Sequence, residues 1–177
     1  MYDGQIHNID GVVKLVEEIK EELETKTGTS LKQVYIAAAG RSLETCKVKV
    51  EKAIDSTKEI DRRTVELLEL EGIQRAQEEI NRNGNKYRYY NIDYSVVEYY
   101  LEDSVMENLQ GHRGEKIGAQ LLATFLPQIV IEGLYSVVSK AGLEVANITL
   151  EPIAAINVAI KEELRLLNLA LVDIGAG

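Results

Sequence analysis

The sequence has little cysteine, no tryptophan and only one phenylalanine. Its one cysteine, Cys46, cannot form a disulfide within the chain, which excludes a disulfide-stabilised scaffold and argues against a cysteine-ligated zinc site. No apolar run reaches the roughly 18 residues of a membrane-spanning helix. Basic residues are also outnumbered, because 20 Lys and Arg stand against 29 Asp and Glu and give a net charge of -9. Proteins that bind nucleic acid normally carry a basic surface, so we expect no nucleic-acid partner.

The composition that remains is that of a globular protein. Apolar residues make up 45% and charged residues 28% of the 177 positions, enough for one domain or for two small ones that share a sheet. Met1 is followed by Tyr2-Asp3-Gly4 and not by a basic stretch and an apolar core, so no signal peptide is indicated and we expect a cytoplasmic protein.

Helical and strand patterns alternate along the first three quarters of the chain. Apolar residues from Val12 to Leu23 recur at helical spacing, with Asn8 or Asp10 as cap and Gly28 as stop. Alternation places Cys46, Val48 and Val50 on one face of a strand. The remaining elements are predicted as strands at 34–39, 87–101 and 116–126 and as helices at 61–81 and 128–141, the first of these helices preceded by a capping pattern at 56–59.

The last 35 residues have the most regular pattern. A strand is predicted at 145–150, and Pro152 suits the first turn of a helix whose apolar residues at 153–159 indicate burial. A further apolar strand is predicted at 169–174, and Gly175-Ala176-Gly177 follows it. Strands that alternate with helices at both ends of a chain indicate an α/β fold.

The residues at the end of that last strand are candidates for a phosphate site. Asp173 ends a predicted buried strand and is followed by Gly-x-Gly, whose backbone N–H groups can close around phosphate oxygens. An aspartate there can hold Mg²⁺ through water or orient a nucleophilic water. A plain hairpin turn is the open alternative, whereas a Walker loop is absent and a Rossmann fingerprint would need a third glycine. Because this loop would be only half of a site, we expect the chain to be a fragment of something longer.

These motifs resemble a known family. Leu171-Val172-Asp173-Ile174-Gly175-Ala176-Gly177 is similar to the second phosphate motif of the actin-like ATPases. Residues 141–145 and 148–155 are similar to the segment that precedes this motif in the FtsA family of bacterial cell-division proteins. Gly4-x-Ile6-x-Asn8, the acidic helix after it and the strand that ends at Gly40 match the same family in style.

The resemblance implies an α/β fold with a partial actin-like (ribonuclease H-like) core and an inserted small α+β subdomain. A first part of the core would lie at 1–40, the inserted interaction subdomain at 41–141, and the return to the core at 142–177, which ends in the second phosphate loop. Residues 41–141 match the family in layout more than in individual residues.

The resemblance also implies site residues for ATP and Mg²⁺ in the full-length parent. Asp173, Gly175, Ala176 and Gly177 would lie at the β- and γ-phosphates, with Asp173 also holding Mg²⁺ through water. Glu151 would be catalytic, near the metal and the attacking water, although an acidic residue before Pro152 equally suits a helix start. Because the other phosphate clamp and the adenosine-binding half lie outside this chain, we expect it to bind no cofactor and to show no ATPase activity alone.

The partners that the resemblance implies are those of bacterial division. Members of the family polymerise and tether the tubulin-like division filament to the membrane, so the expected partners are that filament protein, other division proteins and further copies of the parent. Contact with the membrane would use a segment absent here, and the parent would be peripheral on the inner face of the cell membrane.

Tyrosines are concentrated in one predicted strand, where six of the nine lie between Tyr87 and Tyr100. Tyrosine is common in interface cores, so we predict a partner-binding face that includes Tyr89, Tyr94 and Tyr99. Neighbouring acidic residues would steer this face toward a basic partner. Packing between strands is the open alternative.

Two other functions compete with the division role. One is a PilM-like actin-fold protein of pilus assembly, and the other is a non-enzymatic interaction adaptor in which the glycine loop is only a turn. The actin-like hypothesis makes a structural prediction, namely that the strands at 169–174 and 34–39 belong to one sheet.

Overall fold

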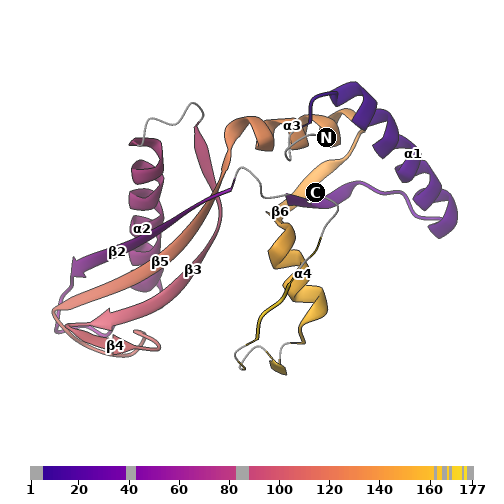
Figure 1. Cartoon of the computed structure of the whole chain (residues 1–177). Helices are drawn as coiled ribbons and strands as arrows, with labels where there is room; N and C mark the ends of the chain where they lie inside the picture. The colour runs from indigo at the N-terminus through magenta and orange to yellow at the C-terminus, as the bar shows by residue number, and fades with distance from the viewer. Residues whose placement is uncertain are drawn as a thin grey trace. The chain divides into compact units, whose positions relative to one another are not determined.

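A computed structural model of the chain describes residues 6–38, 43–82, 88–161, 163–164, 167, 169–172 and 174. The chain divides into two compact units, of which unit 1 comprises residues 1–42 and 129–177 and unit 2 comprises residues 43–128. Figure 1 traces the elements of each unit along the chain. None of the described helices is long and apolar enough to cross a membrane.

The helix α3 (Gln128–Lys140) lies almost wholly in unit 1, which therefore resumes earlier than the sequence patterns suggest. Val137 and Ala141 form a small buried cluster with Val13 of the helix α1 (Ile9–Thr27). This packing is why the compact units separate at residue 128 and not at 141. The functional meaning given to the ranges 1–40, 41–141 and 142–177 stays a prediction.

The ends of α1 follow the sequence prediction. The Asn8 side chain accepts a hydrogen bond from the Gly11 N–H at 2.9 Å, and Gly28 ends the helix in the left-handed conformation with φ of 65°. Glycine adopts this conformation without the steric cost that a Cβ brings. Along the helix, Lys20 Nζ donates to the carbonyl of Ala141 at 3.3 Å and so ties α1 to the end of α3.

Unit 1 contains a parallel pair of strands, β1 (Gln33–Ala38) and β6 (Glu144–Leu150). The register runs from Gln33 opposite Glu144 to Ala38 opposite Leu150, with one shift after Val34. The helix α4 (Glu151–Ala159) follows β6 directly and contacts both strands. Both strands were predicted, and the connection between them passes through the whole of unit 2.

Two predictions for the last part of the chain are wrong for the described residues. No residue of α4 is buried, and Val158 is 90% exposed, so an apolar composition did not imply burial here. Residues 169–172 and 174 form no strand and do not join the sheet of β1 and β6. An apolar run becomes a strand only when a neighbouring strand satisfies its backbone N–H and C=O groups, and β1 and β6 pair with each other alone among the described residues.

Unit 2 is a four-stranded antiparallel sheet in the order β2-β5-β3-β4, with α2 along one face (Figure 1). The strands are β2 (Glu44–Ala53), β5 (Lys116–Pro127), β3 (Tyr89–Leu101) and the short β4 (Ser104–Met106), and the helix is α2 (Arg62–Arg82). β5 is the central strand, because it pairs with β2 on one side and with β3 on the other.

The core of unit 2 lies between α2 and the sheet. Cys46, Val48 and Val50 are buried on one face of β2, as their alternation predicted. On β5 the side chains of Leu121 and Phe125 are fully buried on the same face. α2 covers this face with a buried stripe at helical spacing, made up of Val65, Leu68, Gly72, Ala76 and Ile80.

The start of α2 is capped by a residue other than the one predicted. The Asp61 carboxylate accepts hydrogen bonds from the Thr64 N–H at 2.7 Å and the Thr64 hydroxyl at 2.6 Å. The Ser56–Glu59 pattern lies in a turn instead, where the Asp55 carboxylate holds the Thr57 N–H at 3.0 Å. The helix is therefore capped by Asp61, five residues further along the chain than the predicted cap, Ser56.

A polar contact joins α2 to β3 beside the apolar core. The Glu69 carboxylate accepts the Tyr94 hydroxyl at 2.9 Å on one oxygen and the Tyr99 hydroxyl on the other. The hydrogen bond to Glu69 raises the pKa of Tyr94, with burial adding to it. Burial, and then the same carboxylate, raises the pKa of Tyr99 well above its usual range. We refer to Glu69, Tyr94 and Tyr99 as the Glu69 clamp.

We predict that Gly72→Ala destabilises unit 2, although alanine favours helix over glycine by about 1 kcal/mol. A Cβ at Gly72 would lie 2.3 Å from Cδ1 of Leu121, and Leu121 is fully buried. Repacking such a site costs roughly 1–3 kcal/mol. Chemical denaturation should show a lower free energy of unfolding. In a double variant with Leu121→Val, which removes the clashing carbon, Gly72→Ala should lower the free energy of unfolding less than it does alone. Additive changes in the free energy of unfolding would contradict the close packing of Gly72 against Leu121.

We predict that the free energy of unfolding falls as the pH rises above about 10, the ordinary pKa of tyrosine. The pKa values of Tyr94 and Tyr99 are raised in the folded protein. In that range the unfolded chain has lost protons that the folded chain retains, so stability decreases with pH. Glu69→Gln should weaken this pH dependence and lower the free energy of unfolding by about 1 kcal/mol at neutral pH. Tyrosinate absorbance would report the change directly, and an unchanged titration would argue against the clamp.

Candidate functional site

The carboxyl ends of β1 and β6 form the edge at which the predicted nucleotide site would lie. The two strands are parallel, so both end at the same edge, where Ala38 lies opposite Leu150. Open α/β sheets collect ligands at such ends. Glu151 follows β6 immediately and is exposed as the first residue of α4. It is the predicted site residue that the structure brings to this edge.

The side chain of Glu151 is not used in a helix cap. The residue before it, Leu150, has extended backbone and no capping side chain, and Pro152 lies in the first turn. A carboxylate in the first turn interacts favourably with the helix dipole, so a structural role is also satisfied here. Within the described part of the chain, the Glu151 side chain is exposed and has no ion pair or side-chain hydrogen bond.

The predicted phosphate-loop residues Asp173, Gly175, Ala176 and Gly177 lie outside the described residues. Among the described residues, no three His, Cys, Asp or Glu side chains gather as they would around a metal ion. A Mg²⁺ ion beside Glu151 would accordingly take its other ligands from phosphate, from water or from residues that the structure does not describe. An exposed carboxylate at a strand end fits such an ion, because Mg²⁺ is usually bound through one or two carboxylates.

The hollow near β1 and β6 is at the other end of the strands. It has a volume of about 450 Å³ and is lined by Ser30, Lys32, Gln33, Gly142 and Glu144. Gln33 and Glu144 are the first residues of their strands, and Gln33 Nε2 donates to the Glu144 carboxylate at 3.3 Å. Because Glu151 lies at the carboxyl ends, this hollow does not belong to the predicted phosphate site.

The three tyrosines predicted to bind a partner lie on the face of the unit 2 sheet that α2 covers. Tyr94 and Tyr99 belong to the Glu69 clamp. Tyr89 packs against the core, and burial raises the pKa of its hydroxyl. Its carbonyl accepts a hydrogen bond from the Gln77 side chain of α2. Tyr89 and Tyr99 therefore pack against the core, whereas Tyr94 is 39% exposed and is bonded to Glu69. Binding of a partner through the three tyrosines stays a prediction.

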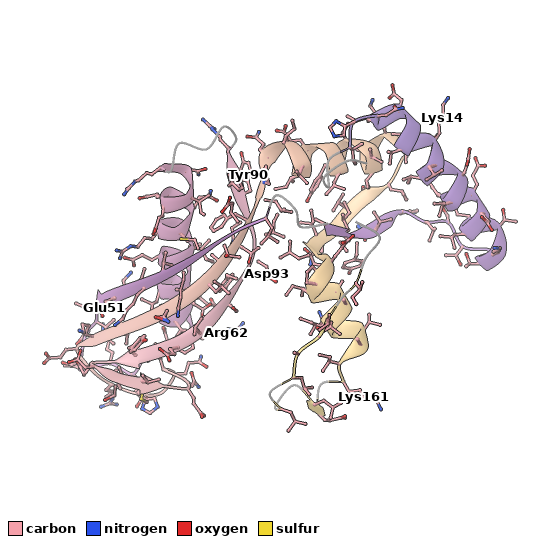
Figure 2. All side chains as sticks on the ribbon, viewed as in Figure 1. Lys14, Glu51, Arg62, Tyr90, Asp93 and Lys161 are labelled. Carbon is pink, nitrogen blue, oxygen red and sulfur yellow. The ribbon has the colours of Figure 1, made fainter. Side chains whose placement is uncertain are left out.

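The opposite face of this sheet is not covered by α2 and carries Tyr90 and Tyr100, two tyrosines of the predicted cluster that were not among the three assigned to the partner-binding face. Figure 2 labels Tyr90 on β3. This residue pairs with Leu126 and is 45% exposed. The Tyr100 hydroxyl donates a hydrogen bond to the Glu98 carboxylate, and this bond raises the pKa of Tyr100. Nζ of Lys49 on β2 lies 4.2 Å from the centre of the Tyr100 ring. The pairing of β2, β5 and β3 brings these side chains together, and no local sequence pattern signals it.

A comparison of the sequence with known proteins finds similarity to a bacterial cell-division protein. The chain is 24% identical to the cell division protein FtsA of Streptococcus pneumoniae serotype 2 (strain D39 / NCTC 7466) over 182 residues, which cover 99% of this chain and 37% of FtsA. No family model matches the chain. The matched region thus includes both units, although the chain spans little more than a third of the relative.

A comparison of structures gives a match in the fold. The chain is similar to a chain of a PilM-PilN type IV pilus biogenesis complex, with a TM-score of 0.57 and 14% sequence identity over 88% of this chain and 38% of that one. At this identity the match bears on the fold alone, and it agrees with the mixed parallel and antiparallel sheets of the two units. The chain is therefore similar in sequence to FtsA over nearly its whole length and has a partial actin-like fold.

Proposed function

We propose that this chain is part of an actin-fold ATPase that acts in bacterial cell division. The observation that carries the proposal is the similarity to FtsA over 99% of the chain, which includes the inserted unit 2 as well as the parts of unit 1 on either side of it. A similarity confined to the parallel strands would support only a general α/β nucleotide fold. In this proposal unit 1 contributes half of a nucleotide site and unit 2 contacts partners or further copies of the parent.

The nucleotide half of the proposal rests on Glu151 and on the sequence after residue 169. Glu151 is exposed at the carboxyl ends of β1 and β6, where a ligand has access to it. Asp173 and the backbone of Gly175, Ala176 and Gly177 would bind the phosphates of ATP, whose Mg²⁺ would neutralise the charge that develops during hydrolysis. Glu151 would orient the attacking water. The remaining groups would come from parts of FtsA-like proteins that this chain does not span.

The cellular half of the proposal is a link between the division filament and the membrane. The full-length protein would bind the tubulin-like filament protein, assemble with copies of itself and remain peripheral on the inner face of the cell membrane. In this role a segment of the full-length protein outside this chain would attach it to the membrane.

A second candidate is a role in type IV pilus assembly. It is favoured by the structural match, because the matching chain belongs to a PilM-PilN complex. The two candidates share the fold and differ in the partner. Sequence similarity over almost the whole chain makes the division role the first choice.

Co-sedimentation with the polymerised tubulin-like division protein of the same organism tests the first choice. We predict that the full-length protein containing this chain pellets with the filaments and fails to bind an immobilised PilN-like segment. The reverse result would favour the pilus role, because each assay presents the partner that only one candidate requires.

We predict that Asp173→Ala in the full-length protein weakens Mg-ATP binding by about tenfold or more, the loss expected when one charge-assisted contact is removed. Asp103→Ala is a matched control, because Asp103 lies on the β3–β4 turn of unit 2 with a 98% exposed side chain. Calorimetry with Mg-ATP would measure both affinities. A full-length protein without measurable Mg-ATP affinity would point to a non-enzymatic adaptor, and equal affinities of the two variants would remove Asp173 from the site.

A further inference from the structure

Among the residues that the structure describes, β2 forms one edge of the unit 2 sheet and pairs on one side only, with β5. Its ten residues pair with β5 in an unbroken register, whereas the pairing of β3 with β5 is interrupted twice. The opposite edge is formed by β4, which has only three residues. Long, regular edges are the ones on which another strand can be added, so β2 is the edge of this sheet best suited to it.

The backbone groups of β2 that face outward can be identified from two hydrogen bonds. Ile54, directly after β2, donates its N–H to the Glu115 carbonyl at 2.9 Å and so continues the ladder toward β5. Backbone groups alternate along a strand, so the even-numbered residues of β2 face β5 and the odd-numbered ones face outward. The Lys49 carbonyl agrees with this, because it accepts a hydrogen bond at 3.1 Å from Arg75 of α2. Thr45, Lys47 and Glu51 face outward in the same way.

Three of the five charged residues of β2, namely Lys47, Lys49 and Glu51, are among these odd-numbered residues. The even-numbered Cys46, Val48 and Val50 are buried toward α2, so the side chains between them lie on the uncovered face. Lys49 pairs with Glu51 at 3.1 Å and lies over the Tyr100 ring. Lys47 is exposed and has no ion pair with any described residue. Two lysines thus stand two residues apart along an open edge.

A hollow lies beside this edge, between β2 and α2. Its volume is about 200 Å³, and it is lined by Val50, Glu51, Glu71, Gln74, Arg75 and Glu78. Its carboxylates already have cationic partners, since Glu71 pairs with Lys52 at 3.1 Å and Glu78 with Arg82 at 2.9 Å. The hollow therefore suits a small, uncharged polar side chain.

We propose that the free edge of β2 binds an extended segment of a partner protein as an added antiparallel strand. The segment would carry carboxylates at two alternate positions, facing Lys47 and Lys49, with a small polar residue between them directed to the hollow. Strand addition takes its affinity from main-chain hydrogen bonds and its specificity from alternate side chains. The inference does not depend on the division role proposed above.

The charge of the chain favours such a segment over a second copy as the occupant. Each chain carries a net charge of -9, so two copies would repel each other at this edge. A segment that is neutral except for two carboxylates avoids most of that repulsion and matches the two lysines locally. An added strand would need to donate a hydrogen bond to the Lys49 carbonyl. Arg75 donates to that carbonyl in this structure, so the added strand would have to displace the Arg75 side chain.

A pair of peptides tests the proposal on the 177-residue chain without altering the protein. Both have threonine throughout except for two glutamates at alternate positions, and they differ only in which alternate amides are N-methylated. An added strand uses every second N–H, so we expect one methylated peptide to bind like the unmethylated parent peptide and the other not to bind. Amide chemical shifts should change most at Thr45, Lys47, Lys49 and Glu51. Equal binding of both methylated peptides, or no binding of the parent peptide, would overturn the proposal.

Two variants are expected to change the peptide affinity in opposite directions, and a third serves as a matched control. Lys47→Glu should weaken binding of the glutamate peptide by about tenfold, as reversal of one local charge pair implies. Arg75→Ala should strengthen binding by about fivefold, because the peptide then does not have to break the hydrogen bond from Arg75 to the Lys49 carbonyl. Arg63→Ala removes an arginine at the start of the same helix and should leave the affinity unchanged. A weaker affinity in Arg75→Ala, or a dimer in sedimentation that the peptide does not dissociate, would refute this assignment of the edge.

Discussion

The burial of β5 between two antiparallel neighbours is the constraint on which the rest of unit 2 depends. β5 is paired on both sides, and Ile117, Leu121 and Phe125 on its α2 side are fully buried. A strand in this position fixes the register of β2 and of β3 at once, because slippage by one residue would move its apolar side chains to the uncovered face. The close approach of α2 at Gly72 follows from the same strand, since Leu121 fills the space that a side chain at Gly72 would need.

The positions of the tyrosines show how much depends on irregularities in β3. Tyr89, Tyr94 and Tyr99 share one face although their numbers alternate between odd and even. Two register shifts, between Asn91 and Asp93 and between Val96 and Glu98, make this possible. Each shift inserts one residue and so exchanges the faces for the residues that follow. A strand without these shifts would divide the three tyrosines between the faces, and the Glu69 clamp could not form.

Much of the fold could be predicted from the sequence where local chemistry decides it. Asn8 and Gly28 end α1 by their own hydrogen bonds and backbone preferences, and the alternation in β2 sets its buried face. The β3–β4 hairpin could not be predicted, because Glu102 takes the left-handed conformation with φ of 52° in its turn. Asn-Gly is the usual signal for such a turn. The Glu102 carboxylate accepts the Glu115 N–H at 2.7 Å, a contact distant in sequence that helps to hold the turn.

Only part of the candidate site could be predicted, and the reason is the small core of unit 1. Among the described residues, the buried cluster of unit 1 consists of Val13, Val137 and Ala141 with a few half-buried neighbours, whereas the cluster of unit 2 is much larger. The other buried apolar residues of unit 1, among them Ala38 and Leu150, are not part of that cluster. Parallel sheets are normally covered on both faces, yet Tyr35 of β1 is 80% exposed. Glu151 can be placed because β6 has a partner in β1. The predicted phosphate loop would need the strand before it, residues 169–174, to pair within the sheet of β1 and β6. Among the described residues, β1 and β6 pair only with each other, so this strand has no partner there.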